Sequence, residues 1–270
     1  MEPWELASSD QFPLRSIDWI KEEMAKKELP PLMMASEMNP IEFVTTGIKS
    51  LDKIVKGFPL ARVTEIYGLE GVGKTSVTLM SIAGMQKEGK KVLFCDVENA
   101  LNPDRASDFG VDLAQLAVTN EVTIEGLSDI ILGYMGNFDA IVVDSLAAMV
   151  PKAEYEGEAG EAHMGLKARQ MGQFMRKVIK PLADTKCALI FINQQRESLE
   201  MFSAKYFTPG GKAVPYATSL RIELKSPKSK GKIEKTVKGV KTRVGQTVTA
   251  QIIKSKVGRP YQETTFDILY

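Results

Sequence analysis

A glycine-rich segment at residues 68–75 carries the residue types needed to bind a nucleoside triphosphate. Its sequence, GLEGVGKT, fits the pattern G-x-x-x-x-G-K-[ST] at every position. Glycines let backbone N–H groups surround phosphate oxygens, the lysine adds positive charge, and the threonine hydroxyl can hold Mg²⁺. The alternative is a chance glycine-rich turn, but a strand-like run before it and a helical pattern after it favour a phosphate site. Its predicted phosphate-binding residues are Gly68, Leu69, Glu70, Gly71, Val72, Gly73, Lys74, Thr75 and Ser76.

Three further polar residues follow apolar, strand-like runs. Asp144 ends the run Ile141–Val143, Glu98 follows Val92–Val97, and Gln194 follows Ile190–Asn193. Ligands of open α/β sheets bind beyond the carboxyl ends of the strands, so these side chains are candidates for the same site. We expect Asp144, with Thr75, to hold Mg²⁺ through water. Glu98 has the chemistry to polarise the attacking water and Gln194 to sense the γ-phosphate, although both also suit ordinary polar positions at strand ends.

The elements that must position these residues alternate between strand and helix. From residue 41 onward this alternation predicts an α/β fold with a mainly parallel central sheet flanked by helices. The expected strands are 63–67, 91–97, 140–144, 188–193, 219–224, 246–254 and 261–270, and the clearest helices are 76–86 and 164–183.

The first 40 residues have a different organisation. Residues 16–27 have a helical apolar stripe with Ser16 as the N-cap, followed by a linker to residue 40. A helix this short is marginal alone, so we expect it to dock either on its own domain or on a neighbouring subunit. The predicted organisation is an N-terminal helix and linker at 1–40 and an ATPase-type core at 41–270, with no separate C-terminal domain.

Composition is that of an ordinary globular protein. The chain has 270 residues, of which 44% are hydrophobic and 26% charged. It has neither an apolar run of about 18 residues nor a signal-like N-terminus, so we expect a cytoplasmic protein that does not bind membranes. Cys95 and Cys187 lie in apolar runs and are expected to be buried free thiols; with one histidine, the chain is a poor candidate for structural zinc.

Positive charge is concentrated in one segment, although the net charge is only +1. Between Arg221 and Arg259 there are 12 lysines and arginines but two acidic residues. Such a segment suits either the solvated face of a hairpin or a nucleic-acid surface, and charge alone does not decide between them.

Several short motifs spread over most of the chain together resemble those of a known protein family. The chain from about Val44 to Tyr270 resembles the RecA family of homologous-recombination ATPases, and this match is far more specific than a phosphate-binding loop alone. The resemblance is carried by residues 65–68, 73–75, 142–148, 151–154, 156–158, 163–166, 190–194, 210–211 and 266–270.

The resemblance implies a protein that uses ATP and Mg²⁺ to form a helical homo-oligomer on single-stranded DNA and to pair it with homologous duplex DNA. By similarity, Glu98 activates water and Gln194 reports the γ-phosphate, beside Lys74 of the loop. Lys254 and Lys256 reach the ATP of the adjacent protomer, in the manner of an arginine finger; the alternative is a solvated strand edge. Single-strand-binding or loader proteins are further candidate partners.

The family's two DNA-binding segments correspond here to residues 156–164 and 195–209, the second closing at two glycines. The resemblance assigns phosphate contacts to arginines and backbone amides, and places apolar side chains between bases. Core packing is the alternative for the apolar residues, and the basic segment 225–243 suits a weaker site for duplex DNA. The implied DNA-binding residues are Met164, Arg169, Arg176, Arg196, Leu199, Met201, Phe202, Gly210, Gly211 and Lys212.

Five residues of this chain differ from those that the family usually has at the same positions. Asn102 and Arg105 stand where bacterial members have an acid and a tyrosine against the adenine, so base selectivity is in question. Glu197 and Glu200 add negative charge to the second segment, and Pro215 replaces a common lysine. The sequence stops at Tyr270, before the family's C-terminal domain, which would fit a minimal or phage-encoded recombinase. Alternative functions are an ATP-switched recombination mediator and a ring-shaped ATPase of the same superfamily.

Overall fold

The computed structural model describes residues 15–157, 165–197, 206–227, 231–237 and 240–270. The chain divides into two compact units, residues 1–40 and 41–270. Met164, Leu199, Met201 and Phe202, together with the acidic Glu200, lie outside the described residues.

The first unit contains the expected helix. Helix α1 spans Ile17–Lys26, and the Ser16 hydroxyl caps it by accepting a hydrogen bond from the Trp19 amide at 3.2 Å. A short 3₁₀ helix, η1, spans Ala35–Glu37. No residue of α1 is buried, and Ile17 and Trp19 are 45% and 43% exposed. An apolar stripe that remains exposed is a candidate docking surface, so the docking of this helix stays a prediction.

The second unit is built on a nine-stranded sheet with the order β11-β12-β10-β3-β7-β6-β4-β5, and β13 also pairs with β12. Strands β10, β3, β7, β6, β4 and β5 are parallel, whereas β11, β12 and β13 run antiparallel to their neighbours at one edge. This mainly parallel sheet confirms the predicted fold class. The strands are β3 (Arg62–Gly68), β4 (Val92–Asp96), β5 (Leu116–Thr119), β6 (Ala140–Asp144), β7 (Ala188–Gln194), β10 (Leu220–Lys225), β11 (Lys232–Val237), β12 (Val240–Ser255) and β13 (Glu263–Leu269).

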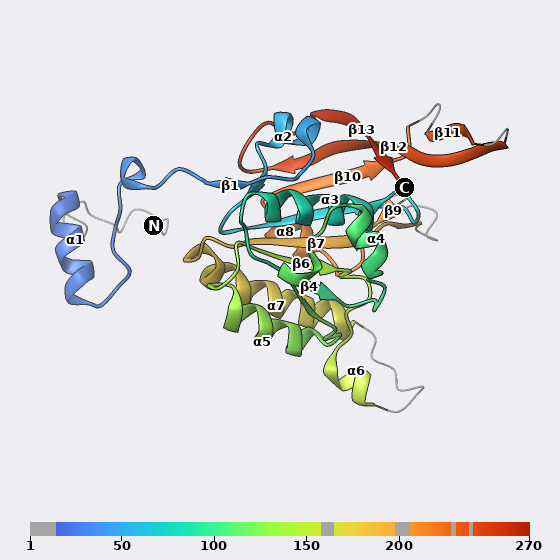
Figure 1. Ribbon diagram of the computed structural model, residues 1–270. Coiled ribbons are helices and arrows are strands. Elements are labelled where there is room, and N and C mark those ends of the chain that lie inside the picture. Colours follow the sequence, from blue (N-terminus) through green and yellow to red (C-terminus); the bar gives the residue numbers. More distant parts are fainter. Residues whose placement is uncertain (1–14, 158–164, 198–205, 228–230, 238–239) are drawn as a thin grey trace, which may run out of the picture. The chain divides into compact units, whose positions relative to one another are not determined.

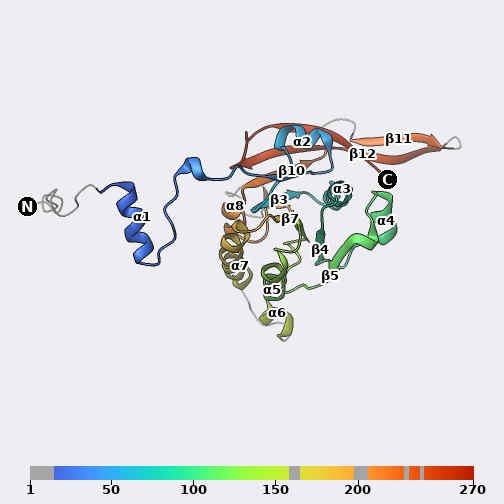
Figure 2. The ribbon, with the colours of Figure 1, turned by 60° about the vertical axis from the view of Figure 1, so that its left-hand side comes forward.

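Helices cover the sheet, as Figures 1 and 2 show, with α5 and α7 packed side by side on one face and α3 over the other. Two short strand pairs, β1 (Phe43–Val44) with β2 (Phe58–Pro59) and β8 (Arg196–Glu197) with β9 (Tyr206–Phe207), lie outside the main sheet. The helices are α2 (Lys49–Val55), α3 (Lys74–Lys87), α4 (Pro103–Asp108), α5 (Ile124–Tyr134), α6 (Lys152–Glu156), α7 (Leu166–Ala183) and α8 (Ala213–Ala217), with a 3₁₀ turn η2 (Leu113–Gln115). None of the described helices is long and apolar enough to cross a membrane.

The hydrophobic core occupies both faces of the sheet. Successive residues of a strand point to opposite faces, so Phe94 packs in the cluster with α3 while Cys95 packs in the cluster with α5 and α7. Because both faces are covered, the central strands are mostly apolar, and polar residues buried in them, such as Thr64 and Glu65 on β3, are exceptions. Cys95 and Cys187 are buried and free, as expected from their apolar runs.

Element boundaries differ from expectation mainly at the antiparallel edge. Strand β12 begins at Val240 instead of residue 246, and pairs with β11 in a hairpin within the basic segment. A hairpin is one of the two interpretations that the sequence allows for this basic segment, but apolar periodicity does not predict its strands because they are largely exposed and rich in lysine. Strand β5, at the opposite edge, is short and only partly buried, and its sequence pattern did not predict it.

Candidate nucleotide and nucleic-acid site

The phosphate-binding loop connects β3 to α3, as its sequence requires. Gly73 caps α3 with φ +98°, a left-handed conformation that favours glycine. A Cβ at Gly73 would lie 2.7 Å from the Ile268 side chain and 2.8 Å from the Gln246 amide nitrogen. Gln246 also donates to the Gly71 carbonyl at 3.4 Å. The antiparallel edge of the sheet therefore packs directly against the loop and fixes its shape.

Lys74 folds back over this loop. Its Nζ donates to the carbonyl oxygens of Gly68 at 3.1 Å and Leu69 at 2.9 Å. Burial lowers the pKa of Lys74, while the negative charges of Asp144 and Glu98 oppose that shift. The ammonium group thus lies among carbonyl oxygens and near two carboxylates, where an incoming phosphate would find an ordered cation.

Thr75 and Asp144 meet at the end of β6. The Thr75 hydroxyl donates to Asp144 Oδ2 at 3.1 Å, although the two residues are 69 positions apart in the sequence. Burial raises the pKa of Asp144 to about 6, and the nearby charge of Glu98 adds to the rise. A buried carboxylate with insufficient positive charge around it, next to a hydroxyl, fits a hydrated Mg²⁺ ion. The two predicted metal residues are therefore brought together.

Glu98 and Gln194 also meet at this edge. Glu98 lies two residues beyond the end of β4, and its Oε1 accepts a hydrogen bond from Gln194 Nε2 at 3.2 Å. The same oxygen accepts a hydrogen bond from the buried Ser145 hydroxyl. Sequence reasoning missed Ser145, and its position directly after Asp144 is the only signal that could have identified it.

Asn102 and Arg105, two of the residues that depart from the family pattern, line a cavity beside α4. Asn102 caps α4 by accepting a hydrogen bond from the Arg105 amide at 3.0 Å. The Arg105 guanidinium donates to the Ser76 hydroxyl at 3.0 Å and lies 5.6 Å from the ring centroid of Tyr270. Tyr270 lines the same cavity, and sequence reasoning did not assign it to the site. The cavity therefore lies between α4 and the residues at the end of β13, and Arg105 connects it to Ser76 on the first turn of α3.

Lys254 and Lys256 stand apart from this protomer's own phosphate loop. Lys254, on β12, donates to the carbonyl oxygens of Pro215 at 2.6 Å and Tyr216 at 3.2 Å, at the end of α8. Burial lowers the pKa of Lys254, and the neighbouring Lys256 and Arg221 lower it further. Lys256 is exposed. The structure thus places the two lysines beside α8, and any role toward a second protomer stays a prediction.

The described DNA-binding candidates gather around the contact between α7 and α8. Arg169 and Arg176 are both exposed and lie seven residues apart on one face of α7. Gly210 and Gly211 have φ +101° and +70°, and a Cβ at Gly211 would lie 3.3 Å from the Ala168 side chain on α7. Lys212 follows them, exposed, at the start of α8, and Arg196 is exposed on β8. These cations are not tied to acidic partners by any described ion pair.

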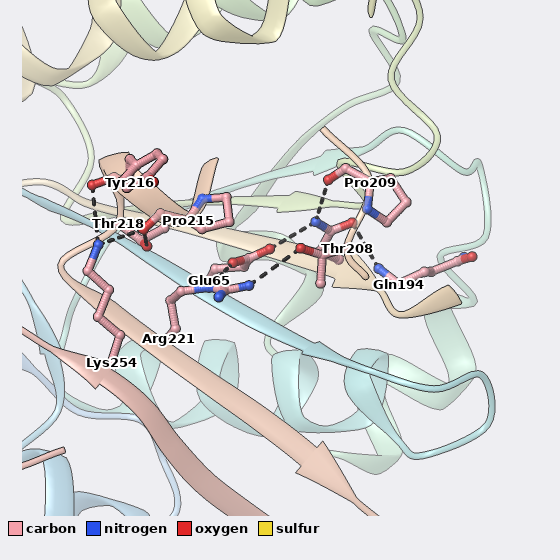
Figure 3. Close-up of polar contacts among 10 residues, drawn as sticks. Glu65, Gln194, Thr208, Pro209, Pro215, Tyr216, Thr218, Arg221 and Lys254 are labelled. Carbon is pink, nitrogen blue, oxygen red and sulfur yellow. Dashed lines mark hydrogen bonds and ion pairs between the residues drawn. The ribbon is translucent and has the colours of Figure 1, made fainter. Parts of the chain in front are cut away.

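A buried polar group connects these regions (Figure 3). Glu65 on β3 is fully buried; its carboxylate accepts hydrogen bonds from Asn193 at 2.9 Å and Arg221 at 2.6 Å. Sequence reasoning did not assign Glu65 or Arg221 to the site. The sequence does contain a signal for them, since each is a charged residue within an apolar, strand-like run. Burying such a charge is costly unless it has a partner, so the two residues could have been expected to pair.

The fold and the phosphate loop define the class of the protein. A strand, a G-x-x-x-x-G-K-T loop and a helix, with an acidic residue at the end of a neighbouring parallel strand, make it an α/β nucleotide-binding protein of the P-loop type. The chain belongs to the RecA family, because the model of the RecA N-terminal domain matches residues 15–270.

Individual relatives agree with this assignment. The chain is 42% identical to "Protein RecA" of Streptomyces venezuelae over 236 residues, covering 86% of this chain and 61% of that protein. It is 41% identical to "Protein RecA" of Leifsonia xyli subsp. xyli, covering 87% and 66% of the two chains. The match to "Protein RecA" of Clostridium acetobutylicum is 40% identical and covers 97% of this chain and 75% of that protein. The chain therefore spans 61–75% of the length of these relatives.

Proposed function

We propose that this protein is an ATP-dependent recombination protein. It forms a helical filament on single-stranded DNA, hydrolyses ATP when bound to that DNA, and exchanges strands with a homologous duplex. The observation that carries the proposal is the convergence of Thr75 with Asp144 and of Glu98 with Gln194 at one sheet edge, in a member of the RecA family. In this organisation residues 41–270 are the ATPase core, and residues 1–40 dock on the next protomer.

The phosphate loop binds the triphosphate through its backbone amides and Lys74. Thr75 and Asp144 hold the Mg²⁺ ion, which supplies positive charge to the β- and γ-phosphates when bound. Lys74 then exchanges the carbonyl oxygens of Gly68 and Leu69 for phosphate oxygens. This exchange is favourable because a hydrogen bond between two charged groups is stronger than one to a neutral carbonyl.

Hydrolysis depends on Glu98 and Gln194. Glu98 orients the attacking water and accepts its proton, while the Gln194 amide contacts the γ-phosphate. The Gln194 side-chain amide donates to Glu98 Oε1 at 3.2 Å, so a bound γ-phosphate would compete with Glu98 for the same amide. Because residue 195 begins the second DNA-binding segment, movement of Gln194 links the nucleotide state to that segment.

The nucleobase occupies the cavity lined by Asn102, Arg105 and Tyr270. The hydrogen bond from Arg105, which lines this cavity, to Ser76 on the first turn of α3 supports a base site beside the phosphate loop. An aromatic ring and a guanidinium plane both stack on a base. Such stacking does not choose among bases, so ATP is proposed on the family relationship, with Arg105 in the place of the family's tyrosine.

Single-stranded DNA binds across α7 and α8. Arg169, Arg176, Arg196 and Lys212 contact phosphates, and the backbone amides of Gly210 and Gly211 add contacts that do not depend on sequence. Met164, Leu199, Met201 and Phe202 are proposed to separate base steps. The β11–β12 hairpin, with exposed Lys232, Lys235 and Lys241, provides a second, weaker site for duplex DNA.

A strand-exchange assay tests the proposal. Purified protein is incubated with circular single-stranded DNA, homologous linear duplex and ATP, and joint molecules are resolved by electrophoresis. Joint molecules that require ATP and homology are the expected result. ATP-dependent DNA binding without joint molecules would instead indicate a recombination mediator, and closed rings in electron micrographs would indicate a ring-shaped ATPase.

A further inference from the structure

We propose that Glu65 is a positioning residue which, through Asn193 and Arg221, ties the two ends of the segment 195–209 to one point of the sheet. The role of that segment in DNA binding rests on the proposed function, whereas its anchoring does not. In Figure 3 the Glu65 carboxylate lies beside Arg221, with Thr208, Pro209 and Gln194 grouped on its other side.

Glu65 lies inside the sheet and has no access to solvent. It is 0% exposed, and its Oε2 accepts a hydrogen bond from Arg221 Nε at 2.6 Å, while its Oε1 accepts one from Asn193 Nδ2 at 2.9 Å. The Arg221 side chain is 14% exposed. Removing one partner of a buried ion pair leaves the other charge uncompensated, which is strongly destabilising. The position of each group is therefore determined by the other.

The N-terminal end of the segment is fixed by Asn193. Asn193 Oδ1 accepts a hydrogen bond from the backbone N–H of Gln194 at 2.9 Å. Asn193 Nδ2 donates to the Glu65 carboxylate. Asn193 is itself 0% exposed. The chain therefore leaves β7 in one orientation, and this orientation determines where Gln194 points.

The C-terminal end is fixed by the same three residues. Asn193 Nδ2 also donates to the Pro209 carbonyl at 2.9 Å, and Arg221 donates to the Thr208 hydroxyl at 3.4 Å. Between the two ends, β8 and β9 pair antiparallel, with Arg196 opposite Phe207. The two described ends of the segment are therefore paired with each other, and both are held by the group formed by Glu65, Asn193 and Arg221.

Arg221 also connects this group to the neighbouring strands. Its guanidinium lies 4.6 Å from the ring centroid of Tyr67 on β3, and it pairs in register with Lys254 on β12. Glu65 and Tyr67 lie on the strand that ends at the phosphate loop. The pair formed by Glu65 and Arg221 therefore contacts three parts of the protein. These are the paired ends of the segment 195–209, the strand that leads to the phosphate loop and the strand that carries Lys254.

Limited trypsin digestion of the full chain, without nucleotide or DNA, tests the anchor. The variants are Glu65→Gln, which removes the charge but keeps the shape, and Arg221→Lys, which keeps the charge but cannot bind Glu65 and Thr208 together. Glu42→Gln is the matched control, because Glu42 forms an exposed ion pair with Lys186 at 2.9 Å. The rates of cleavage after Arg196, at one paired end of the segment, and after Lys87, at the end of α3, are measured by mass spectrometry.

We expect cleavage after Arg196 to accelerate about tenfold or more in Glu65→Gln and severalfold in Arg221→Lys, because charge-assisted hydrogen bonds that hold the two ends of the segment are lost. Cleavage after Lys87 should stay within about twofold of the parent, and Glu42→Gln should change neither rate. Unchanged cleavage after Arg196 in both variants would overturn the proposal. An equal rise after Lys87 would also overturn it, since this would mean general loosening of the core.

Affinity for single-stranded DNA, measured in parallel by fluorescence anisotropy with a non-hydrolysable ATP analogue, separates the two proposals. If the parent binds DNA, Glu65→Gln should bind it about tenfold more weakly, because the unanchored segment must be ordered on binding. An unchanged affinity of Glu65→Gln would contradict the positioning role. If the parent does not bind DNA, the proposed function fails, and the digestion result still decides whether Glu65 anchors the segment.

Discussion

Lys254 Nζ lies 2.6 Å from the carbonyl oxygen of Pro215. A lysine on β12 thus donates a hydrogen bond to a carbonyl group of α8 within the same protomer. The last carbonyl groups of a helix have no partner inside the helix, and a lysine there satisfies them. If Lys254 is to reach the ATP of an adjacent protomer, it must leave these carbonyls. Assembly of the protomers would then remove Lys254 from α8, so that it would also affect the position of α8 and of Lys212 at its start.

Replacing Lys254 by alanine should therefore abolish most of the DNA-stimulated ATP hydrolysis. We expect the stimulated rate to fall about 10²- to 10³-fold, since a cation supplied from a neighbour stabilises charge in the transition state. The measurement is a coupled ATPase assay with and without circular single-stranded DNA. Lys186→Ala, which removes an exposed charge paired with Glu42 and assigned no role in ATP or DNA binding, is the control. A stimulated rate in Lys254→Ala equal to that of the parent would exclude the intersubunit role.

Replacing Asp144 by asparagine should weaken Mg²⁺-dependent binding of ATP. The substitution removes the carboxylate that lies 3.1 Å from the Thr75 hydroxyl, and loss of one metal-orienting group typically costs about 10- to 100-fold in affinity. Titration calorimetry with ATP, at saturating Mg²⁺ and in the presence of EDTA, measures the effect. Asp139→Asn, which removes a carboxylate of a partly exposed ion pair with Lys90, should leave affinity unchanged. Equal Mg²⁺ dependence in Asp144→Asn and the parent would exclude this metal site.

The grouping of the residues of the candidate nucleotide site could be predicted because the sequence signals for it lie in short continuous segments. The phosphate loop is a contiguous pattern, and Asp144 and Gln194 end apolar runs, so the geometry of a parallel sheet brings them together. The pairings themselves could not be predicted. Glu98 accepts from both Gln194 and Ser145, and Arg105 reaches Ser76, through contacts that depend on side-chain orientation and on turns beyond the strand ends.

Binding of single-stranded DNA should weaken steeply with salt. Four described cations are proposed to contact phosphates: Arg169, Arg176, Arg196 and Lys212. Counterion release then predicts that log K falls with log salt concentration with a slope of roughly −3, and that Arg176→Ala reduces the slope by about 0.7. Anisotropy titrations between low and moderate salt measure both values. Lys177→Ala, on the part of α7 that faces α5, should leave the slope unchanged, and a flat salt response of the parent would contradict the phosphate contacts.

Both cysteines should be unreactive in the folded protein. Burial raises the pKa of Cys95 to about 12, and the pKa of Cys187 to about 12 as well, so at pH 8 roughly one thiol in ten thousand is ionised. Because the thiolate is the nucleophile, modification by a disulfide reagent should be slow until the protein is unfolded in guanidinium chloride. Rapid modification of either cysteine in the folded protein at pH 8 would contradict their burial.

The antiparallel edge of the sheet was the part of the fold least accessible to prediction. Strand β12 continues into the basic segment because it pairs with β11, and such pairing leaves little trace in apolar periodicity when both strands face solvent. Glu65 and Arg221 illustrate a related limit. Each is visible as a charge in an apolar strand, but their pairing depends on β3 and β10 being neighbours, with Glu65 in register with Arg221.

The most direct test of the account is the rate of ATP hydrolysis by the full chain with and without saturating single-stranded DNA. In the proposed mechanism Gln194 links the γ-phosphate to the second DNA-binding segment, and lysines of a neighbouring protomer complete the ATPase site only when protomers assemble on DNA. It therefore predicts stimulation of at least about 10²-fold by DNA, since a charge supplied in trans contributes this much or more. Equal rates with and without DNA would contradict it.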